Sequence, residues 1–485
     1  MTKPTSLDQA IDTFFQPISD AIAGFIFYSV PVMGAQVPLI VCWLVLGACF
    51  FTVYLGFINL RGFGHAVGLV RGKYAKPGAQ GEITPFQALS AAVSGTVGIG
   101  NIAGVAITIS LGGPGAILWL IFAGFVGMTT KFVECALGVK YRQINPDGTV
   151  SGGPMYYLSG GLAQRGRPRL GKFLGGFYAV SIIIGCLGIG NMFQSNQAYG
   201  QLLYVTGGEG GPLVGMGWLV GIAMAVLVGL IVVGGIKSIA QVTSKLVPFM
   251  VVIYIIGAVV VIGMNAANLP AAIGAIIAGA FTPSGVAGGF VGIMILGFQR
   301  AAFSNEAGIG SAAIAHSAVS TKDPISEGFV GLLEPFIDTV VICTLTGLVI
   351  VTSFPPETFM AGSLQGIELT SAAFASQLSW SPVPLSVAAL LFAFSTMLAW
   401  AYYGTKAWTY MLGEGRAAQY TFSVIFCIFI VIGAAVQLDA ILQISDALIF
   451  IMAIPNLIGL YIMAPEVKRD LGDYIARLSA SRADG

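Results

Sequence analysis

Long apolar runs divided by short polar segments dominate this chain of 485 residues. A helix that crosses a bilayer needs roughly 20 mainly apolar residues. The pattern predicts eleven such spans, at about 37–59, 85–110, 113–137, 174–198, 212–234, 246–266, 287–315, 328–352, 383–405, 418–437 and 444–465. Two further apolar pieces, 267–284 and 359–379, are interrupted by proline, glycine and polar residues, so we expect short helices there on the outer face.

The first 36 residues follow a different pattern. Between residues 11 and 28, aromatic side chains such as Phe14, Phe15 and Phe25 are mixed with the acids Asp12 and Asp20. This mixture is typical of a helix that lies in the membrane interface and does not cross it. We therefore expect an amino-terminal interfacial segment over 1–36.

Composition supports an integral membrane protein. Hydrophobic residues make up 56% of the chain and charged residues only 9%, whereas soluble domains carry about 25% charge. The net charge of +1 comes without a basic patch, so nucleic-acid binding is not expected. Two distant histidines and six cysteines within apolar stretches give no pattern of metal ligands.

Basic residues fall almost entirely in alternate loops. Nineteen of the 22 Lys and Arg side chains lie in these loops and in the carboxyl-terminal segment, and the intervening loops contain none. Positively charged loops stay on the cytoplasmic side, so the pattern predicts an amino terminus outside and a carboxyl terminus in the cytoplasm. Lys3, Lys131 and Arg300 stand apart from this pattern.

The second predicted span contains a stretch that is unfavourable for a helix. Residues 94–101 read SGTVGIGN, with three glycines, each of which costs roughly 1 kcal/mol relative to alanine inside a helix. A similar pattern, AGIGS at 307–311, lies in the seventh span. The second and the seventh span are five crossings apart along the chain. Because five is an odd number, these two spans enter the membrane from opposite sides.

Inverted repeats with discontinuous helices are typical of secondary transporters. Unwound backbone is tolerated at bilayer depth only where it is buried in protein or lines a cavity, and its free amides and carbonyls can then hold a carboxylate or a cation. Alternatively, the glycines only permit close helix packing. Thr96 and Asn101 add polar side chains that packing does not require, which favours a binding site.

Several sequence blocks resemble the alanine or glycine:cation symporter family, whose members are often called sodium:alanine symporters. The blocks are SGTVGIGNIAGVAITISLGGPGAILWL, TKFVECALGVKYR, GGPMYYL, GNMFQSNQ, QRAAFSNEAGIGSAA and LEPFIDT. The resemblance implies an all-α membrane protein of about eleven transmembrane helices with a leucine-transporter-like fold. Two inverted five-helix repeats with two discontinuous helices would occupy 85–266 and 287–465, with an extra helix at 37–60 and a cytoplasmic tail at 466–485.

The resemblance also implies a function. The family couples inward movement of sodium to uptake of small neutral amino acids, chiefly alanine and glycine, by alternating access. Sodium would be co-transported, and the chain would lie in the plasma (inner) membrane of a bacterium. The oligomeric state does not follow from the sequence.

A zwitterionic substrate needs groups for both of its charges. We expect amides around Thr96, Gly98, Ile99 and Gly100 to hold the carboxylate, because glycine lets a ligand approach the backbone closely. The ammonium would face the seventh span at its break. The residues expected there are Phe303, Ser304 and Asn305.

Other contacts with the substrate follow from the fourth and ninth spans. By resemblance, Gln194 borders the substrate, although a helix-to-helix hydrogen bond is the alternative for it. Trp400 would wall the pocket against large side chains, with ordinary core packing as its alternative. Thr396 and Trp400 are four residues apart and therefore share a helix face.

Sodium prefers hard oxygen ligands. By resemblance to the leucine-transporter-like fold, the hydroxyls of Ser395 and Thr396 and the carbonyls of Ser94 and Val97 would bind it. By the same resemblance, Asn101 matches a position where some proteins of the wider fold bind another sodium ion.

Buried charges suggest further roles and an alternative mode of coupling. Glu134, Arg300, Glu306, Glu334 and Asp338 fall within or near spans, where an unpaired charge is expensive. Ion pairs between helices, or a gate, fit them better than substrate contact. Proton coupling through Glu306 or Glu134 is the main alternative to sodium coupling.

Other function classes fit the sequence less well. A channel would usually build its pore from an oligomer around an axis, whereas the two breaks lie within one chain. Neither a nucleotide-binding P-loop nor a histidine-based enzyme motif is present. We therefore do not expect an enzyme or a nucleotide-driven pump.

Overall fold

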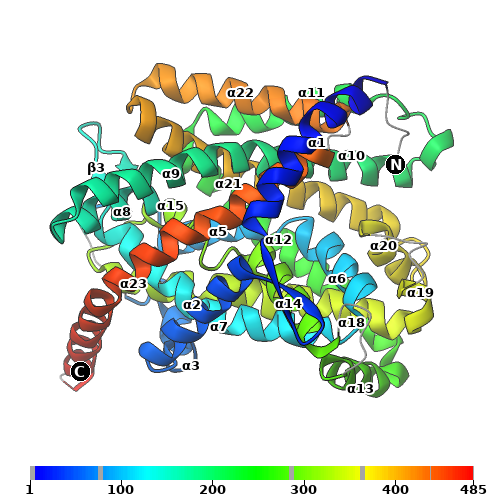
Figure 1. Cartoon of the computed structure of the whole chain (residues 1–485), viewed down its shortest axis with the longest axis horizontal. Coiled ribbons are helices and arrows are strands. Elements are labelled where there is room, and N and C mark those ends of the chain that lie inside the picture. Colours follow the sequence, from blue (N-terminus) through cyan, green and yellow to red (C-terminus); the bar gives the residue numbers. More distant parts are fainter. Residues whose placement is uncertain (1–5, 75–79, 283–288, 361–365, 437–438, 484–485) are drawn as a thin grey trace.

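A computed structural model describes residues 6–74, 80–282, 289–360, 366–436 and 439–483. Lys3 and Lys76 lie outside the described residues, as do small parts of the predicted segments 1–36, 359–379 and 466–485. Helices make up most of the described residues (Figure 1).

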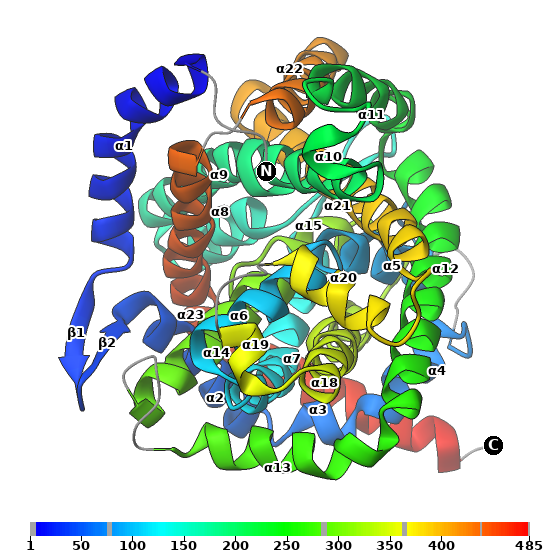
Figure 2. The same cartoon turned by 90° about the vertical axis from the view of Figure 1, so that its right-hand side faces the viewer.

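The first 140 residues provide the outer helices and the first interrupted helix. Their helical elements are α1 (Ser6–Ile26), α2 (Leu39–Tyr54), α3 (Ile58–Arg61), α4 (Phe63–Val70), α5 (Pro85–Thr96), η1 (Gly100–Gly104), α6 (Val105–Gly112) and α7 (Ala116–Lys140). Helix α1 packs along the carboxyl-terminal helix, and the two lie side by side in both views (Figures 1 and 2).

Two short hairpins depart from the purely helical prediction. Strands β1 (Ser29–Val32) and β2 (Ala35–Pro38) pair antiparallel, with Val30 opposite Val37. Met33 and Gly34 form the two-residue turn with positive φ angles, +49° and +85°, as hairpins of this length require. A second, minimal pair joins β3 (Gln143–Ile144) to β4 (Val150–Ser151). Strands this short carry too little alternating pattern to be predicted among apolar spans.

The middle of the chain is helical from residue 154 to residue 280, apart from short connections. Its helical elements are α8 (Pro154–Gln164), α9 (Pro168–Leu187), η2 (Gly188–Met192), α10 (Phe193–Val205), η3 (Gly208–Gly210), α11 (Gly217–Val232), α12 (Gly235–Met264), η4 (Ala266–Asn268) and α13 (Leu269–Ala280).

The last third begins with the second interrupted helix. Its helical elements are α14 (Gly289–Asn305), α15 (Ala312–His316), α16 (Pro324–Gly331), α17 (Leu333–Pro335), η5 (Phe336–Cys343), α18 (Thr344–Ser353), α19 (Pro356–Met360), α20 (Ile367–Ala375), α21 (Pro382–Leu412), α22 (Arg416–Ala435) and α23 (Asp439–Ala483).

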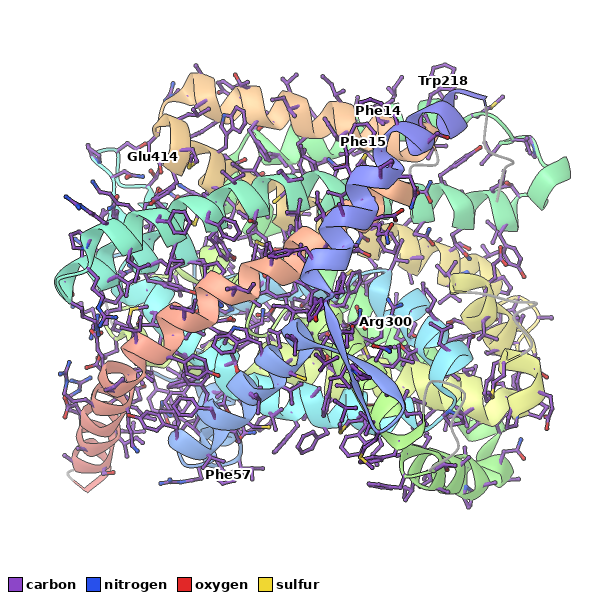
Figure 3. The ribbon with its side chains drawn as sticks, in the orientation of Figure 1. Phe14, Phe15, Phe57, Trp218, Arg300 and Glu414 are labelled. Atoms are coloured by element: carbon purple, nitrogen blue, oxygen red, sulfur yellow. The ribbon has the colours of Figure 1, made fainter. Side chains whose placement is uncertain are left out.

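Large apolar side chains cover much of the outer surface. Along α12, Phe249, Val252 and Ile256 are each more than half exposed. Phe14 and Trp218 lie near the upper outline of the molecule, and Phe57 near its lower edge (Figure 3). A soluble protein rarely exposes so much contiguous apolar surface, so these faces fit contact with lipid.

Seven helices within the described residues are long and apolar enough to cross a membrane, or up to eight if the bent pair α5 and α6 counts as one span. Helices also occupy the other predicted spans. However, α2 and α11 are 16 residues each, shorter than the roughly 20 that a span needs. The multi-pass architecture is therefore clear, while the count of eleven spans and the repeat boundaries stay predictions.

The interior brings the two interrupted helices together. Helix α14 packs against both η1 and α6, and η1 packs against η5. Helix α21 packs on α5, α9, α10 and η2. Residues around 95–101 and 303–311, far apart in sequence, therefore meet in the middle of the bundle.

Candidate functional site

The first break lies where α5 ends. Its start is fixed by a capping box, in which Thr84 and Gln87 each accept the other's backbone N–H. Helical structure ends at Thr96, Val97 is extended, and the two halves of the pair are bent by 52°. The sequence therefore correctly predicts an interruption at this place.

The backbone at this break has lost helical hydrogen bonds. The N–H of Gly98 donates to the Oδ1 of Asn101 at 2.8 Å. In a continuous helix this N–H would bond to the carbonyl of Ser94, so that carbonyl is free to accept another partner. The N–H of Ile99 also donates to no acceptor in the described ranges.

The second break follows α14. Glu306 has a φ of +56°, a conformation that is strained for a residue other than glycine and that clusters at functional sites. The N–H of Ala307 donates to the Oδ1 of Asn305 at 3.0 Å, and the hydroxyl of Ser311 bonds to Glu306. Helical structure resumes only at Ala312.

A small cavity of about 30 Å³ lies between the two breaks. Eight of the predicted site residues line it: Thr96, Gly98, Gly100, Gln194, Phe303, Ser304, Thr396 and Trp400. The sequence did not predict the other five, which are Gly95, Ile189, Phe193, Glu306 and Ile449. Residues from five separate stretches of the chain thus converge on one small space, which we call the central cavity.

Two buried oxygen atoms in the wall of the central cavity lack partners. The Oγ1 of Thr396 and the Oε1 of Gln194 make no hydrogen bond in the described part of the chain. A Cβ built on Gly98 would lie 2.7 Å from that hydroxyl oxygen and 3.6 Å from that amide oxygen. Buried polar atoms normally have partners, so this pair indicates a site for a polar ligand or a cation.

Trp400 closes another side of the central cavity. Its Nε1 donates to the carbonyl of Gly95 at 3.3 Å. A Cβ on Gly190 would come within 2.4 Å of the indole, so only glycine allows this close packing. The indole is therefore held both by a hydrogen bond to α5 and by contact with η2.

Six of the predicted site residues do not line the central cavity: Ser94, Val97, Ile99, Asn101, Asn305 and Ser395. Asn305 turns away, because its Nδ2 donates to Thr339 at 2.9 Å and its Oδ1 caps the break. Ile99 is buried without lining the cavity. The hydroxyl of Ser395 donates to the carbonyl of Phe392 at 3.0 Å and lies near the sulfur of Met250.

Asn101 belongs to a buried hydrogen-bond network. Its Nδ2 donates to the Oγ of Ser304 at 3.0 Å and to the Oδ1 of Asp338 at 2.5 Å. Ser304 in turn donates to the Oδ2 of Asp338 at 2.8 Å. This network joins η1, α14 and η5, and it fixes the amide oxygen that holds Gly98.

Three π-helical segments surround the site within the described residues. They are η1, η2 and η5, which contribute Gly100, Ile189 and Asp338. Such insertions occur frequently at functional sites. Hydrophobic periodicity does not predict them, since each is the insertion of a single residue into an α-helix.

Other amides of this region have structural roles. Asn191 donates to the carbonyl of Phe426 at 2.6 Å, and Asn196 to that of Gly433 at 3.2 Å. Both bonds join the α9–α10 region to α22. Gln194 differs, because its Nε2 bonds to the carbonyl of Ile189 at 3.2 Å and leaves its oxygen free.

Buried charges form pairs behind the site. Lys131 and Glu334 make an ion pair of 3.0 Å with both side chains fully buried, and the Nδ1 of His316 lies 2.6 Å from Glu327. The ion pair joins α7 to α17, as expected for charges that fasten helices. Glu306 instead lines the central cavity, although the sequence favoured an ion pair or a gate for this residue.

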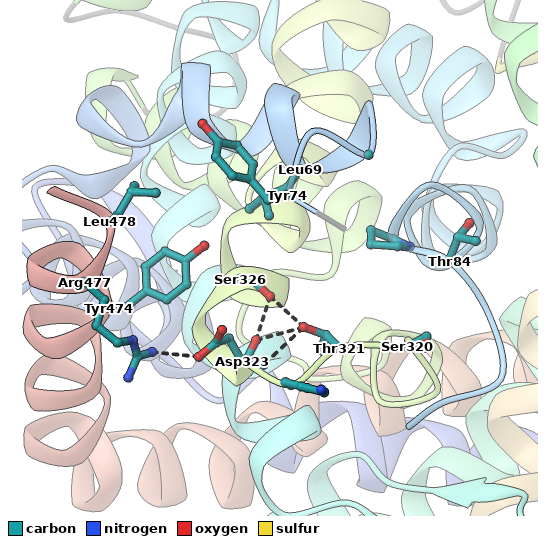
Figure 4. A pocket seen from close by; sticks show the side chains of 13 residues that line it. Leu69, Tyr74, Thr84, Ser320, Thr321, Asp323, Ser326, Tyr474, Arg477 and Leu478 are labelled. Atoms are coloured by element: carbon teal, nitrogen blue, oxygen red, sulfur yellow. Dashed lines mark hydrogen bonds and ion pairs between the residues drawn. The ribbon is translucent and has the colours of Figure 1, made fainter. Parts of the chain in front are cut away.

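A wider cavity of about 420 Å³ lies at the far end of α23 (Figure 4). Arg477 donates to the Oδ1 of Asp323 at 2.7 Å across one side of it. The hydroxyl of Ser326 donates to the carbonyl of Asp323 at 2.6 Å. This cavity shares no lining residue with the central cavity, and it lies on the face that the charge pattern predicts to be cytoplasmic.

Several known proteins resemble this chain over most of its length. The family model of the sodium:alanine symporter family matches residues 25–484. The sodium/alanine symporter AgcS of Methanococcus maripaludis is 38% identical over 420 residues, which cover 86% of this chain and 89% of that protein. The probable sodium/glutamine symporter GlnT of Bacillus subtilis is 32% identical, over 89% of this chain and 87% of that protein.

A solved structure resembles the fold. MhsT in complex with L-phenylalanine matches with a TM-score of 0.56 at 15% identity, over 80% of this chain and 90% of that chain. At this identity the likeness shows the fold alone, and that fold is leucine-transporter-like, as predicted. Together, the family match and the relatives show that this chain belongs to the sodium:alanine symporter family of membrane transporters.

Proposed function

We propose that the chain carries small neutral amino acids, alanine or glycine, into the cell together with sodium. The observation that carries this proposal is the central cavity itself, which both helix breaks line. Secondary transporters bind their substrates at such breaks. The family, the relatives named for alanine and glutamine and the phenylalanine-bound structure of the same fold support an amino acid as the substrate.

The break in α5 is suited to the substrate carboxylate. The N–H of Ile99 has no acceptor in the described ranges, and Gly98 and Gly100 leave the backbone accessible. In this proposal Gln194 and the region of Phe303 and Ser304 contact the remainder of the substrate. Glu306, whose side chain lines the central cavity, is the one acid among its lining residues that can face an ammonium group.

Sodium would bind on the α21 side of the same break. The carbonyl of Ser94 does not accept the N–H of Gly98, because that N–H donates to the side chain of Asn101. The hydroxyl oxygen of Thr396 has no hydrogen-bond partner in the described residues.

The carbonyl of Val97 and the oxygen of Ser395 complete the proposed ligand set. The Ser395 hydroxyl donates its hydrogen to the carbonyl of Phe392, which leaves the oxygen lone pairs for the cation. Neutral oxygen atoms of this kind suit a hard, singly charged cation that must be released again.

The central cavity limits the size of the substrate. The rings of Phe303 and Trp400 both line this small space, and they favour the smallest amino acids. Alternating access would then move the two proposed repeats, 85–266 and 287–465, about the central cavity.

Uptake of radiolabelled L-alanine into proteoliposomes tests the proposal. We expect accumulation under an inward sodium gradient, none with potassium in its place, and no loss when a protonophore collapses the proton gradient. Uptake that ignores sodium but follows a proton gradient would overturn sodium coupling, and it would direct attention to Glu306 as the proton carrier. Absence of saturation would favour a channel.

A further inference from the structure

One half of each interrupted helix runs from the central cavity to the wider cavity at the far end of α23. Helix α5 has Thr96 at the central cavity, and its N-cap residue Thr84 lines the wider cavity. The other half-helix, α15, packs against α5. Glu306, before it, lines the central cavity, and Ser320, after it, lines the wider cavity (Figure 4). The two half-helices therefore lie side by side between the central cavity and the face that the loop charges predict to be cytoplasmic.

The chain segments next to these half-helices pair with each other at that face. Ile83 and Val319 form a parallel β-bridge. The N–H of Glu82 donates to the carbonyl of Ala318 at 2.8 Å, and the N–H of Ser320 donates to the carbonyl of Ile83 at 2.7 Å. We call these five residues the seam. It ties the end of α5 to the end of α15.

The close approach at the seam requires a glycine. Gly81 has a φ of +148°, and a Cβ there would lie 2.2 Å from the carbonyl oxygen of Val319 and 2.5 Å from the backbone of Ser320. Backbone atoms cannot turn aside as the end of a flexible side chain can. A side chain at residue 81 would therefore push the two segments apart, whereas glycine lets them meet.

Arg142, which lies just after α7, holds both segments from outside the two half-helices. Its Nη1 donates to the carbonyls of Ser317 at 2.9 Å and Val319 at 2.5 Å. Its Nη2 donates to the carbonyls of Gln80 at 2.7 Å and Thr321 at 3.1 Å. One guanidinium group thus bonds to the segment before α5 and to the segment after α15, and all four acceptors are backbone oxygens.

An arginine side chain suits this arrangement better than a lysine. The guanidinium group is planar and presents five N–H donors in a fixed fork, whereas the lysine ammonium is a compact point charge. The fork can therefore reach carbonyls of two segments at once. Hydrogen bonds from a charged donor are also stronger than those between neutral groups. The charge of Arg142 interacts in addition with the buried Glu327 of α16.

We propose that Arg142 closes the transport path on its cytoplasmic side by holding the seam together while the central cavity is loaded. Release of the substrate toward this face would require the guanidinium group to leave one of the two segments, so that α5 and α15 can separate. This inference rests on the proposed function, because it assigns one step of alternating access to a residue outside the proposed substrate and sodium sites.

Hydrogen exchange of the whole chain in lipid nanodiscs, measured by mass spectrometry, tests the hold on the seam. The N–H groups of Glu82 and Ser320 donate across the seam, so their exchange reports its opening. Arg142→Gln should raise exchange in both peptides by about tenfold or more, because a hydrogen bond from a charged group is worth at least that factor. Arg165→Gln is the matched control, since Arg165 lies on the same face and pairs with Glu466 of α23.

Uptake of radiolabelled L-alanine under a sodium gradient tests the role in transport. The initial rate should fall by about tenfold or more in Arg142→Gln, for the same loss of hydrogen bonds. Arg142→Lys should not restore it, because one ammonium group cannot hold both segments. Gly81→Ala should reproduce the faster exchange and the slower uptake, since it opens the seam without changing Arg142. Arg165→Gln should transport at the wild-type rate.

The possible outcomes separate a gate from a general structural role. Unchanged exchange, faster exchange in only one of the two peptides, or uptake at the wild-type rate in Arg142→Gln would overturn the inference. An equal rise in peptides of α22 would assign Arg142 to general stability, and full recovery in Arg142→Lys would show that charge alone suffices; either result would also overturn it. Absence of alanine uptake by the wild type would instead contradict the proposed function, while the exchange rates would still decide whether Arg142 holds the seam.

Discussion

A methyl group on Gly98 would lie 2.7 Å from the Oγ1 of Thr396. The break in α5 and the middle of α21 therefore touch at the point where two buried oxygens lack partners. Any side chain at residue 98 would take the space between these oxygens.

We predict that Gly98→Ala lowers alanine transport strongly. Overpacking of this kind costs about 1–3 kcal/mol, which corresponds to roughly 5- to 150-fold in an equilibrium. Initial rates of alanine uptake measure the effect. Gly104→Ala is the matched control, because a Cβ there would meet nothing within 4 Å; equal rates in the two variants would contradict the prediction.

We predict that Thr396→Val raises the sodium concentration for half-maximal uptake by about tenfold or more, the change that corresponds to 1.4 kcal/mol. Valine keeps the shape of the side chain and removes the unpartnered hydroxyl. Thr396→Ser keeps the hydroxyl and should stay close to the wild type. An unchanged sodium dependence in the valine variant would remove Thr396 from the proposed cation site.

We predict that Trp400→Ala admits larger amino acids. The indole walls the central cavity and is anchored to the carbonyl of Gly95. The ratio of leucine to alanine uptake, measured within each variant, should rise about tenfold or more over the wild type, while Trp400→Phe should change it little. A constant ratio would assign Trp400 to core packing alone.

We predict that Lys131→Met lowers the free energy of unfolding by about 3–5 kcal/mol, because it removes the ammonium group that lies 3.0 Å from the fully buried Glu334. The double variant Lys131→Met, Glu334→Met should recover most of this loss. Thermal unfolding in detergent measures both.

The exposed ion pair of Arg477 and Asp323 provides the control for this prediction. The Arg477 side chain is 64% exposed, and such pairs contribute about 0–1 kcal/mol. Arg477→Gln should therefore change the melting temperature little. A similar loss in Arg477→Gln and Lys131→Met would show that burial does not set the cost.

The sequence predicted the interruptions well, because glycine acts through the backbone. Gly98 and Gly100 weaken the helix whatever surrounds them, and the paired pattern at 307–311 does the same in α14 and α15. The family resemblance then identified candidate residues in distant segments, such as Gln194 and Thr396, and both of these line the central cavity.

The direction of individual side chains could not be predicted. Within an irregular segment no periodicity tells which neighbour turns inward, so Glu306 lines the central cavity and Asn305 does not. Likewise, Ser395 bonds to its own helix while Thr396 keeps a free oxygen.

The network around Asn101 bears on the order in which the protein is made. Its side chain holds the break in α5, yet its partners Ser304 and Asp338 follow 203 and 237 residues later in the chain. Until ribosomes have synthesised α14 and η5, the Asn101 side chain that holds Gly98 lacks these two partners, and peptide groups without hydrogen bonds are costly within the membrane. The first broken span can therefore reach its final form only late in biosynthesis, when the second is already in the membrane.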